Sequence, residues 1–192
     1  MHDFEITIKD DLAQEQIWIK AAQNDPAAFE PLFNKYHDMI FNYALRRTGN
    51  VLLSQDIAAT TFMKALDQIK KFQWQGISIS SWLYRIAINE IHLHFRKNHR
   101  MVPLTSEIAH KLKDDRQTDA RMLEIEESIL QNEQFQRVCR AIAKLKLNYQ
   151  TILTLRYFEE KSIKEIADIL NLSQNTVKTQ IRRGLIYLKR IL

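Results

Sequence analysis

Apolar side chains recur along this chain at intervals of three and four residues, the spacing of helices that bury one face. In the first hundred residues this spacing predicts helices over 12–23, from Pro26 to about residue 48, over 51–70 and over 81–99. From about Asp119 the spacing is helical again, through Leu123, Ile129, Val138, Ile142 and Leu145, and shorter helices follow near 149–158, 163–170 and 174–190.

Each predicted helix has a set of apolar positions that we expect to point inward. These positions are Leu12, Ile17 and Ala21; Phe29, Leu32, Phe33, Tyr36, Ile40, Tyr43 and Ala44; Leu53, Ile57, Phe62, Leu66 and Ile69; Leu83, Ala87, Ile91 and Phe95; and Val177, Ile181, Leu185 and Leu188.

Local signals set several helix boundaries. Asp25 before Pro26 is typical of an N-cap followed by proline in the first helical turn. Pro31 either bends the following helix or marks its true start, and Gly49-Asn50 is expected to end it.

The composition agrees with a helical protein. Only 3 glycines and 3 prolines occur in 192 residues, which disfavours turn-rich barrels and glycine-rich phosphate loops. One cysteine, Cys139, excludes an internal disulfide and fits a reducing compartment. The acidic start does not resemble a signal peptide, and no run of 18 apolar residues occurs. We expect a cytoplasmic protein that does not insert into a membrane.

Residues 100–118 contain Pro103 and mostly polar side chains, so this stretch is the best candidate for a linker. Fully extended, about 19 residues span roughly 60–68 Å. We therefore expect two small helical domains, 1–100 and 119–192, joined by a flexible linker over 101–118.

A modest net charge of +5 conceals two basic segments. Residues 61–101 carry 7 basic and 2 acidic side chains, and residues 140–192 carry 11 and 4. The other segments are acidic, with 5 basic and 9 acidic side chains in 1–60 and 5 and 8 in 102–139. Two basic segments are typical either of two contacts with a polyanion or of solvated helices.

The C-terminal segment SIKEIADILNLSQNTVKTQIRRGLIYLKR favours the first interpretation. Ser162 and Glu165 form a capping box, Asn171 tolerates a left-handed turn, and Ser173 caps a second helix. A small residue, Ala167, four positions before the turn lets two helices cross closely, as in a helix-turn-helix. Its outward positions suit phosphates and base edges: Lys178, Thr179, Arg182 and Arg183.

Residues 61–101 combine six aromatic side chains with the basic ones. Beside the apolar stripe of the predicted helix 81–99 runs a polar, basic stripe, and aromatic Trp82 lies at its start. Aromatic and basic groups together suit unstacked bases, although an isolated aromatic is more often part of a core. The polar stripe contains Arg85, Asn89, His92, Arg96 and His99.

No catalytic or cofactor-binding group is expected. Residues 61–101 contain only Asp67 and Glu90 as acids, too few for a nuclease-type carboxylate cluster. His92 and His94 are two positions apart, on different faces of a helix, so no metal site is predicted.

Four segments in this order resemble a known family. The segments AAFEPLFNKYHDMIFNYALRRTGN, DIAATTFMKAL, SSWLYRIAINEIHLHFRK and LKLNYQTILTLRYFEEKSIKEIADILNLSQNTVKTQIRRG cover most of residues 12–190. Together they are similar to bacterial sigma-70 family sigma factors of the extracytoplasmic-function (ECF) type. The resemblance implies a non-enzymatic subunit that binds core RNA polymerase and directs it to promoter DNA.

The resemblance also implies roles for particular residues. Asp56, Ile57, Phe62 and Lys64 would lie on the helix that docks on core polymerase. Trp82, Arg85, Asn89, His92 and Arg96 would capture the melted −10 element, and Lys178, Thr179, Arg182 and Arg183 would read the −35 duplex. Members of the family are commonly held inactive by an anti-sigma factor, which is therefore an expected partner.

The chain departs from the family at three positions. Ala59 and Thr60 replace a frequent Gln-Glu pair on the helix that would dock on core polymerase. Leu93 replaces a frequent Asp or Asn on the −10 helix, so we expect a different −10 preference. The alternative is a stand-alone helix-turn-helix regulator whose N-terminal domain senses a ligand or dimerises. Such a regulator would bind duplex DNA tightly without polymerase.

Overall fold

The computed structural model describes residues 2–98 and 133–192, with side chains placed in 11–96 and 137–192. Within these ranges all regular secondary structure is helical, which confirms the expected all-α class. No helix of the described part is long and apolar enough to cross a membrane.

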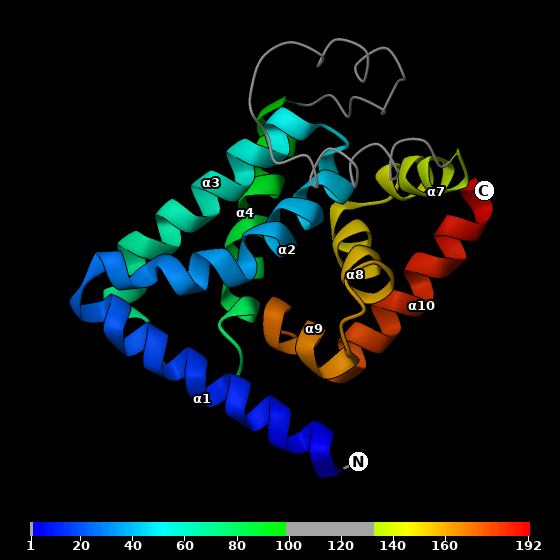
Figure 1. The fold of residues 1–192 in the computed structure, drawn as a ribbon. Helices are drawn as coiled ribbons and strands as arrows, with labels where there is room; N and C mark the ends of the chain where they lie inside the picture. Colours follow the sequence, from blue (N-terminus) through cyan, green and yellow to red (C-terminus); the bar gives the residue numbers. More distant parts are fainter. Residues whose placement is uncertain (1, 99–132) are drawn as a thin grey trace.

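The N-terminal half consists of four α-helices and two short 3₁₀ helices (Figure 1). Helix α1 runs along the outer edge of this half, while α2 packs against both α3 and α4. The elements are α1 (His2–Asn24), η1 (Pro26–Phe29), α2 (Glu30–Thr48), α3 (Val51–Gln68), η2 (Ile69–Lys71) and α4 (Ser80–Asn98).

The helix boundaries follow the local signals. The Asp25 side chain accepts a 3.0 Å hydrogen bond from the Ala27 amide and so caps η1. Pro31 lies in the first turn of α2, so it marks the start of that helix and does not bend it. Gly49 ends α2 with φ of 63°, and Asn50 caps α3 through a 2.9 Å bond from the Leu53 amide.

The expected inward face of α1 is wrong. Ile17 is 59% exposed and Ala21 is also exposed, whereas Glu15, Ile19 and Ala22 are buried. The cause is Glu15, whose carboxylate has partners inside the protein and turns the helix towards them. Phe33 on α2, Leu66 on α3 and Leu185 on α10 were also expected inward and are exposed instead.

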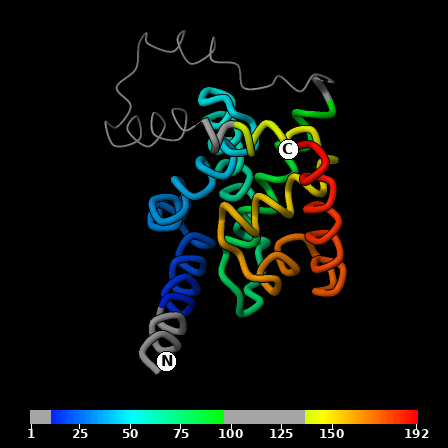
Figure 2. The backbone as a smooth tube through the Cα atoms, turned by 90° about the vertical axis from the view of Figure 1, so that its right-hand side faces the viewer, coloured from blue at the N-terminus to red at the C-terminus, as the bar shows by residue number. Residues whose placement is uncertain are grey.

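The C-terminal half contains α7 (Glu133–Ala143), α8 (Leu147–Tyr157), α9 (Ile163–Leu170) and α10 (Gln174–Ile191). In Figure 2 the molecule is turned so that this half faces the viewer. The capping box of α9 is present, with hydrogen bonds of 2.8 and 3.2 Å between Ser162 and Glu165. Asn171 adopts φ of 52° and ψ of 49°, the left-handed conformation expected for the turn.

The two halves pack against each other through α2 and α8 and through α4 and α9. Buried apolar residues of both halves form one continuous core, from Ile40 and Leu83 to Ile152 and Ile166. The predicted linker over 101–118 and the expected boundaries at 100 and 119 lie outside the described residues.

Candidate nucleic-acid interface

The polar stripe of α4 lies partly at the surface. Arg85, Asn89 and Arg96 are exposed, and His92 is half-buried. Trp82 is also half-buried and packs on Phe72, with ring centroids 4.7 Å apart. His99, the last member of the predicted stripe, lies outside the described residues.

An open cavity of about 610 Å³ lies in front of α4. It is bounded by the end of α3, by the segment 72–79 and by the first turns of α4. Sequence reasoning identified Trp82 and Arg85 in its wall but missed the glutamines of the segment, whose only signal was their place in a polar loop. The cavity is lined by Gln68, Lys71, Phe72, Gln73, Gln75, Ile77, Ser78, Ser81, Trp82 and Arg85.

The helix-turn-helix is formed by α9 and α10. Ser173 caps α10 through a 3.1 Å bond from the Thr176 amide, and Val177 is fully buried against the first helix. Gly184 lets α8 approach closely, because a Cβ atom there would lie 3.2 Å from Leu153 Cδ1. The predicted contact residues of α10 are all exposed: Lys178, Thr179, Arg182 and Arg183.

Of the residues on α3 that were predicted to bind core polymerase, two are buried inside the protein and two lie nearer the surface. Ile57 and Phe62 are each 4% exposed and belong to the protein core. Asp56 is exposed, and Lys64 forms a 2.6 Å ion pair with Glu90 of α4. The outer face of α3 instead presents Leu52 and Met63, at 54% and 68% exposure.

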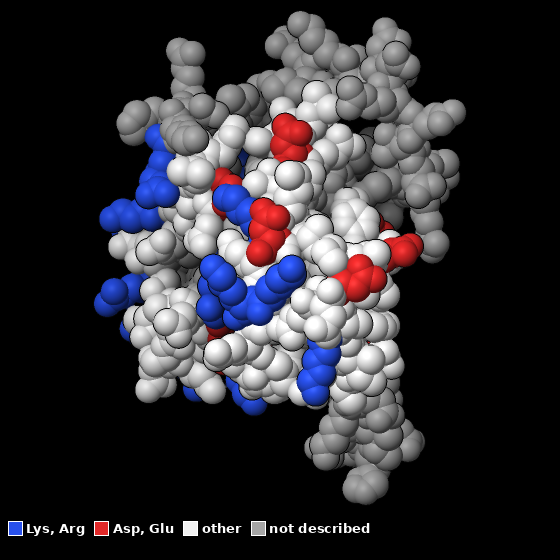
Figure 3. All heavy atoms as spheres, turned by 90° about the vertical axis from the view of Figure 1, so that its left-hand side faces the viewer, with Lys and Arg blue, Asp and Glu red and all other residues white. Residues whose placement is uncertain are grey.

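On the side of the molecule turned away from α10, the charged side chains of residues 11–96 and 137–192 form no continuous band. Figure 3 shows Lys and Arg in small groups on that face, separated by uncharged surface and by acidic side chains. The described side chains therefore offer a long polyanion no continuous basic track on that face.

The C-terminal half occupies part of the basic stripe of α4. Arg85 donates hydrogen bonds of 2.7 and 3.1 Å to the main-chain oxygens of Asp168 and Ile169, at the C-terminal end of α9. A cation at that end also interacts favourably with the helix dipole. Farther along α4, His92 Nε2 lies 3.0 Å from Thr151 Oγ1 of α8.

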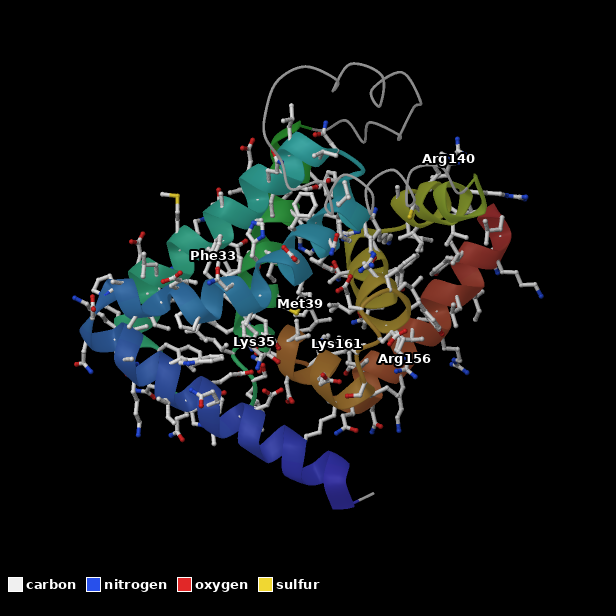
Figure 4. All side chains as sticks on the ribbon, in the orientation of Figure 1. Phe33, Lys35, Met39, Arg140, Arg156 and Lys161 are labelled. Carbon is white, nitrogen blue, oxygen red and sulfur yellow. The ribbon has the colours of Figure 1, made fainter. Side chains whose placement is uncertain are left out.

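Glu159 is the polar centre of the contact between the halves. Its side chain is only 5% exposed and forms a 2.5 Å ion pair with Arg46 of α2. The Tyr84 hydroxyl donates a 2.7 Å bond to its second oxygen, and the Lys161 ammonium lies 5.4 Å from the Tyr84 ring centroid. Figure 4 shows Lys161 at this junction, on the side of Met39 of α2.

A second arginine in the contact has no carboxylate partner within residues 11–96 and 137–192. Arg47 is 6% exposed and donates through Nη1 to Gln150 at 2.5 Å. Among the described residues its Nε and Nη2 have no hydrogen-bond acceptor. Burial lowers the pKa of Arg47, an effect that the neighbouring Tyr43 offsets in part. The packed arrangement therefore contains a buried cation that separation of the halves would rehydrate.

Burial also changes the titration of His92. Together with the nearby charges of Arg47 and Arg96, it lowers the pKa of this imidazole to about 4. His92 is therefore neutral at pH 7 while the halves are packed together.

Known proteins are similar to this chain in sequence and in fold. Residues 32–101 match the family model of Sigma-70 region 2, and residues 135–188 match that of Sigma-70, region 4. ECF RNA polymerase sigma factor SigW of Bacillus subtilis is 34% identical over 164 residues, covering 84% of this chain and 87% of that protein.

Two solved structures have a similar fold at lower identity. The structure of CnrH in complex with the cytosolic domain of CnrY aligns with a TM-score of 0.63 at 20% identity, over 92% of this chain and 96% of that one. The sigma factor RpoE of Bartonella quintana, in complex with the anti-sigma factor NepR, gives a TM-score of 0.59 at 17% identity, over 85% and 95%.

Proposed function

This chain belongs to the sigma-70 family of RNA polymerase sigma factors, of the ECF type, and we propose which of its surfaces perform each step of promoter recognition. As a sigma factor it binds core polymerase and directs transcription to specific promoters. The proposal assigns the −35 element to α10, the −10 element to the cavity in front of α4, and the core enzyme to the outer face of α3.

The −35 assignment rests on the exposed face of α10. Its N-terminal part carries a lysine, a threonine and two arginines, while Val177 and Gly184 on the opposite side pack inside the protein. Arginine and lysine pair with guanine edges in the major groove, and hydroxyl groups bind phosphates or bases. Each good base contact discriminates by about 1–3 kcal/mol.

The −10 assignment rests on the cavity, which is the observation that carries the proposal furthest. Trp82 and Phe72 supply aromatic surface for stacking, and Arg85 and Lys71 supply positive charge for the backbone. Glutamine amides both donate and accept hydrogen bonds, as base edges do. A cavity of about 610 Å³ with this wall is suited to a base that has left the duplex.

The outer face of α3 is suited to a protein partner. It presents Leu52, Asp56 and Met63 at helical spacing, while Ile57 and Phe62 keep the helix fixed to the core. We assign core-polymerase docking to these exposed side chains and give the two buried ones a supporting role.

In the packed arrangement, one residue that lines the −10 cavity is held by the C-terminal half. Arg85 borders the −10 cavity and is bonded to the end of α9, next to the −35 helix. Promoter elements two duplex turns apart would be separated by roughly 70 Å, at about 34 Å per turn. We therefore infer that the halves separate before both elements are bound.

Three further expectations belong to the proposal. The protein works in the cytoplasm, where its polymerase and DNA partners are, and it catalyses no reaction itself. A protein inhibitor of the anti-sigma class is the expected regulator, and Bartonella quintana RpoE provides an example of such a complex.

The test is reconstitution with sigma-free bacterial core polymerase, followed by run-off transcription from a random-promoter pool. Co-elution and specific transcripts are expected from the wild type. Trp82→Ala should lose transcripts that depend on the −10 sequence, and Arg182→Ala should relax selection at the −35 element. Lys189→Ala, which removes a charge from the last turn of α10, is the matched control. Tight duplex binding without core association would instead favour the stand-alone regulator.

A further inference from the structure

Helix α1 holds the cavity-forming segment 72–79 at its beginning. The Gln23 side chain donates hydrogen bonds of 3.1 and 2.8 Å from Nε2 to the main-chain oxygens of Ile69 and Phe72. Ile69 is the first residue of η2, and Phe72 follows η2 directly as the first residue of the segment. One amide group on α1 thus fixes the point at which the chain leaves α3 and η2.

The same helix holds the end of the segment through Glu15. This residue is 2% exposed, and its carboxylate accepts a 3.0 Å bond from the Ile79 amide and a 3.2 Å bond from the Ser78 hydroxyl. Ser80 follows at once as the first residue of α4. Gln23 and Glu15 are eight residues apart on α1, or about 12 Å along its axis.

The groups around Glu15 keep its carboxylate in the position that binds the end of the segment. A buried carboxylate is costly unless its oxygens are paired, and here Lys35 Nζ lies 3.2 Å away and the Tyr36 hydroxyl also donates to it. Burial, together with Glu15, raises the pKa of Tyr36 well above its usual range, so the phenol keeps its proton and remains a donor. The buried amide of Ile79 would have no partner if the carboxylate were removed.

Between the two ends the segment has room to adapt. Gly76 has φ of 74°, and apart from its two chain neighbours no described residue places a heavy atom within 4 Å of the position that a Cβ would occupy. Gln73, Gln75 and Ile77 all line the cavity. The structure therefore combines fixed ends with an adaptable centre.

We propose that Gln23 and Glu15 are positioning residues for promoter opening, which hold segment 72–79 as a preformed receptor for an unpaired base. The inference rests on the assignment of the cavity to the −10 element. A receptor that is ordered before binding loses less entropy when the base arrives, so the captured state is favoured. Helix α1 precedes the residues that match region 2, yet it contributes directly to the shape of the cavity.

The experiment uses holoenzyme assembled from core polymerase and full-length variants. Gln23→Met removes both donors at similar size, Glu15→Gln keeps an acceptor for the Ile79 amide, and Glu15→Met removes it. Asn24→Ala is the matched control, because among the described residues that side chain bonds only to the Lys20 main-chain oxygen within α1. The DNA is the promoter that the wild type transcribes best from the random pool, both as a duplex and with its −10 segment mismatched.

Gln23→Met is expected to weaken binding to the mismatched promoter about tenfold and to speed amide exchange in residues 72–79. Affinity for core polymerase and for a −35 duplex should change less than twofold, as with Asn24→Ala. Glu15→Gln should lose about threefold where Glu15→Met loses tenfold or more. This recovery by the conservative variant is not expected if Glu15 only contributes to overall stability.

If Gln23→Met shows the same amide exchange in residues 72–79 and the same affinity for the mismatched promoter as the wild type, the positioning role is wrong. Trp82→Ala keeps this result separate from the underlying assignment. If Trp82→Ala binds the mismatched promoter normally, the assignment of the cavity is wrong. If Trp82→Ala loses binding and Gln23→Met does not, only the positioning role is wrong.

Discussion

The hydroxyl of Tyr84 donates a 2.7 Å hydrogen bond to the carboxylate of Glu159, which is 75 positions further along the chain. Tyr84 belongs to α4, which borders the cavity proposed for the −10 element, and Glu159 precedes the helix-turn-helix. Burial raises the pKa of Tyr84, so its proton remains in place for this bond. The bond, with the Arg46 ion pair beside it, joins the N-terminal and C-terminal halves.

The first prediction concerns this junction. Glu159→Gln removes the charge that pairs with Arg46, and losing a buried charge-assisted bond costs about 1–3 kcal/mol. The packed arrangement should become less populated. The measurement is the distance between labels at Met63→Cys and Lys189→Cys, in a Cys139→Ser background. Glu160→Gln, at an exposed neighbouring position, should leave the distance unchanged.

The second prediction is a pH dependence. The pKa of His92 is about 4 when the halves are packed and returns towards 6.5 when they separate. Between these values the separated state binds a proton that the packed state does not, so the packed state loses stability as pH falls from 7 to 5. The same label distance should increase over this range. His92→Gln should remove most of the change, and an unaltered pH profile in that variant would contradict the assignment.

The third prediction concerns the contact between α8 and α10. Gly184→Ala places a Cβ 3.2 Å from Leu153, a fully buried side chain, so crowding should outweigh the higher helix propensity of alanine. We expect a loss of about 1 kcal/mol in unfolding free energy, measured by denaturant titration. The double variant with Leu153→Val should lose less than the sum of the two single changes.

The fourth prediction concerns the turn of the helix-turn-helix. Asn171 has φ of 52°, a conformation that costs glycine almost nothing and alanine roughly 1 kcal/mol. Asn171→Gly should raise the thermal midpoint slightly, and Asn171→Ala should lower it by several degrees. Equal midpoints for these two variants would show that the turn does not limit stability.

The C-terminal helices could be predicted well because their signals are local. The capping box of Ser162 and Glu165 and the left-handed Asn171 depend on residues three or four positions away. The caps Asp25, Asn50 and Ser173 are equally local. Such patterns determine helix ends whatever else the chain contacts.

The inward face of α1 could not be predicted in the same way. Apolar spacing selected Ile17, but the buried carboxylate of Glu15 decides which side faces the protein. Its partners at Ser78 and Ile79 are 63 and 64 residues away. The junction is still more remote, since Arg46 and Glu159 are 113 positions apart. Hydropathy along the chain contains no information on such pairs.

Arg85 binds α9 through main-chain oxygens. The contact therefore constrains the side chain at position 85 but not the side chains of its acceptor residues. Any sequence that forms this helix presents carbonyl groups at its C-terminal end, whatever side chain occupies position 168. Position 168 can therefore change without loss of the contact, whereas position 85 must remain arginine to keep both bonds. Divergence in the C-terminal half, to which we assign the −35 element, need not disturb how α4 is held.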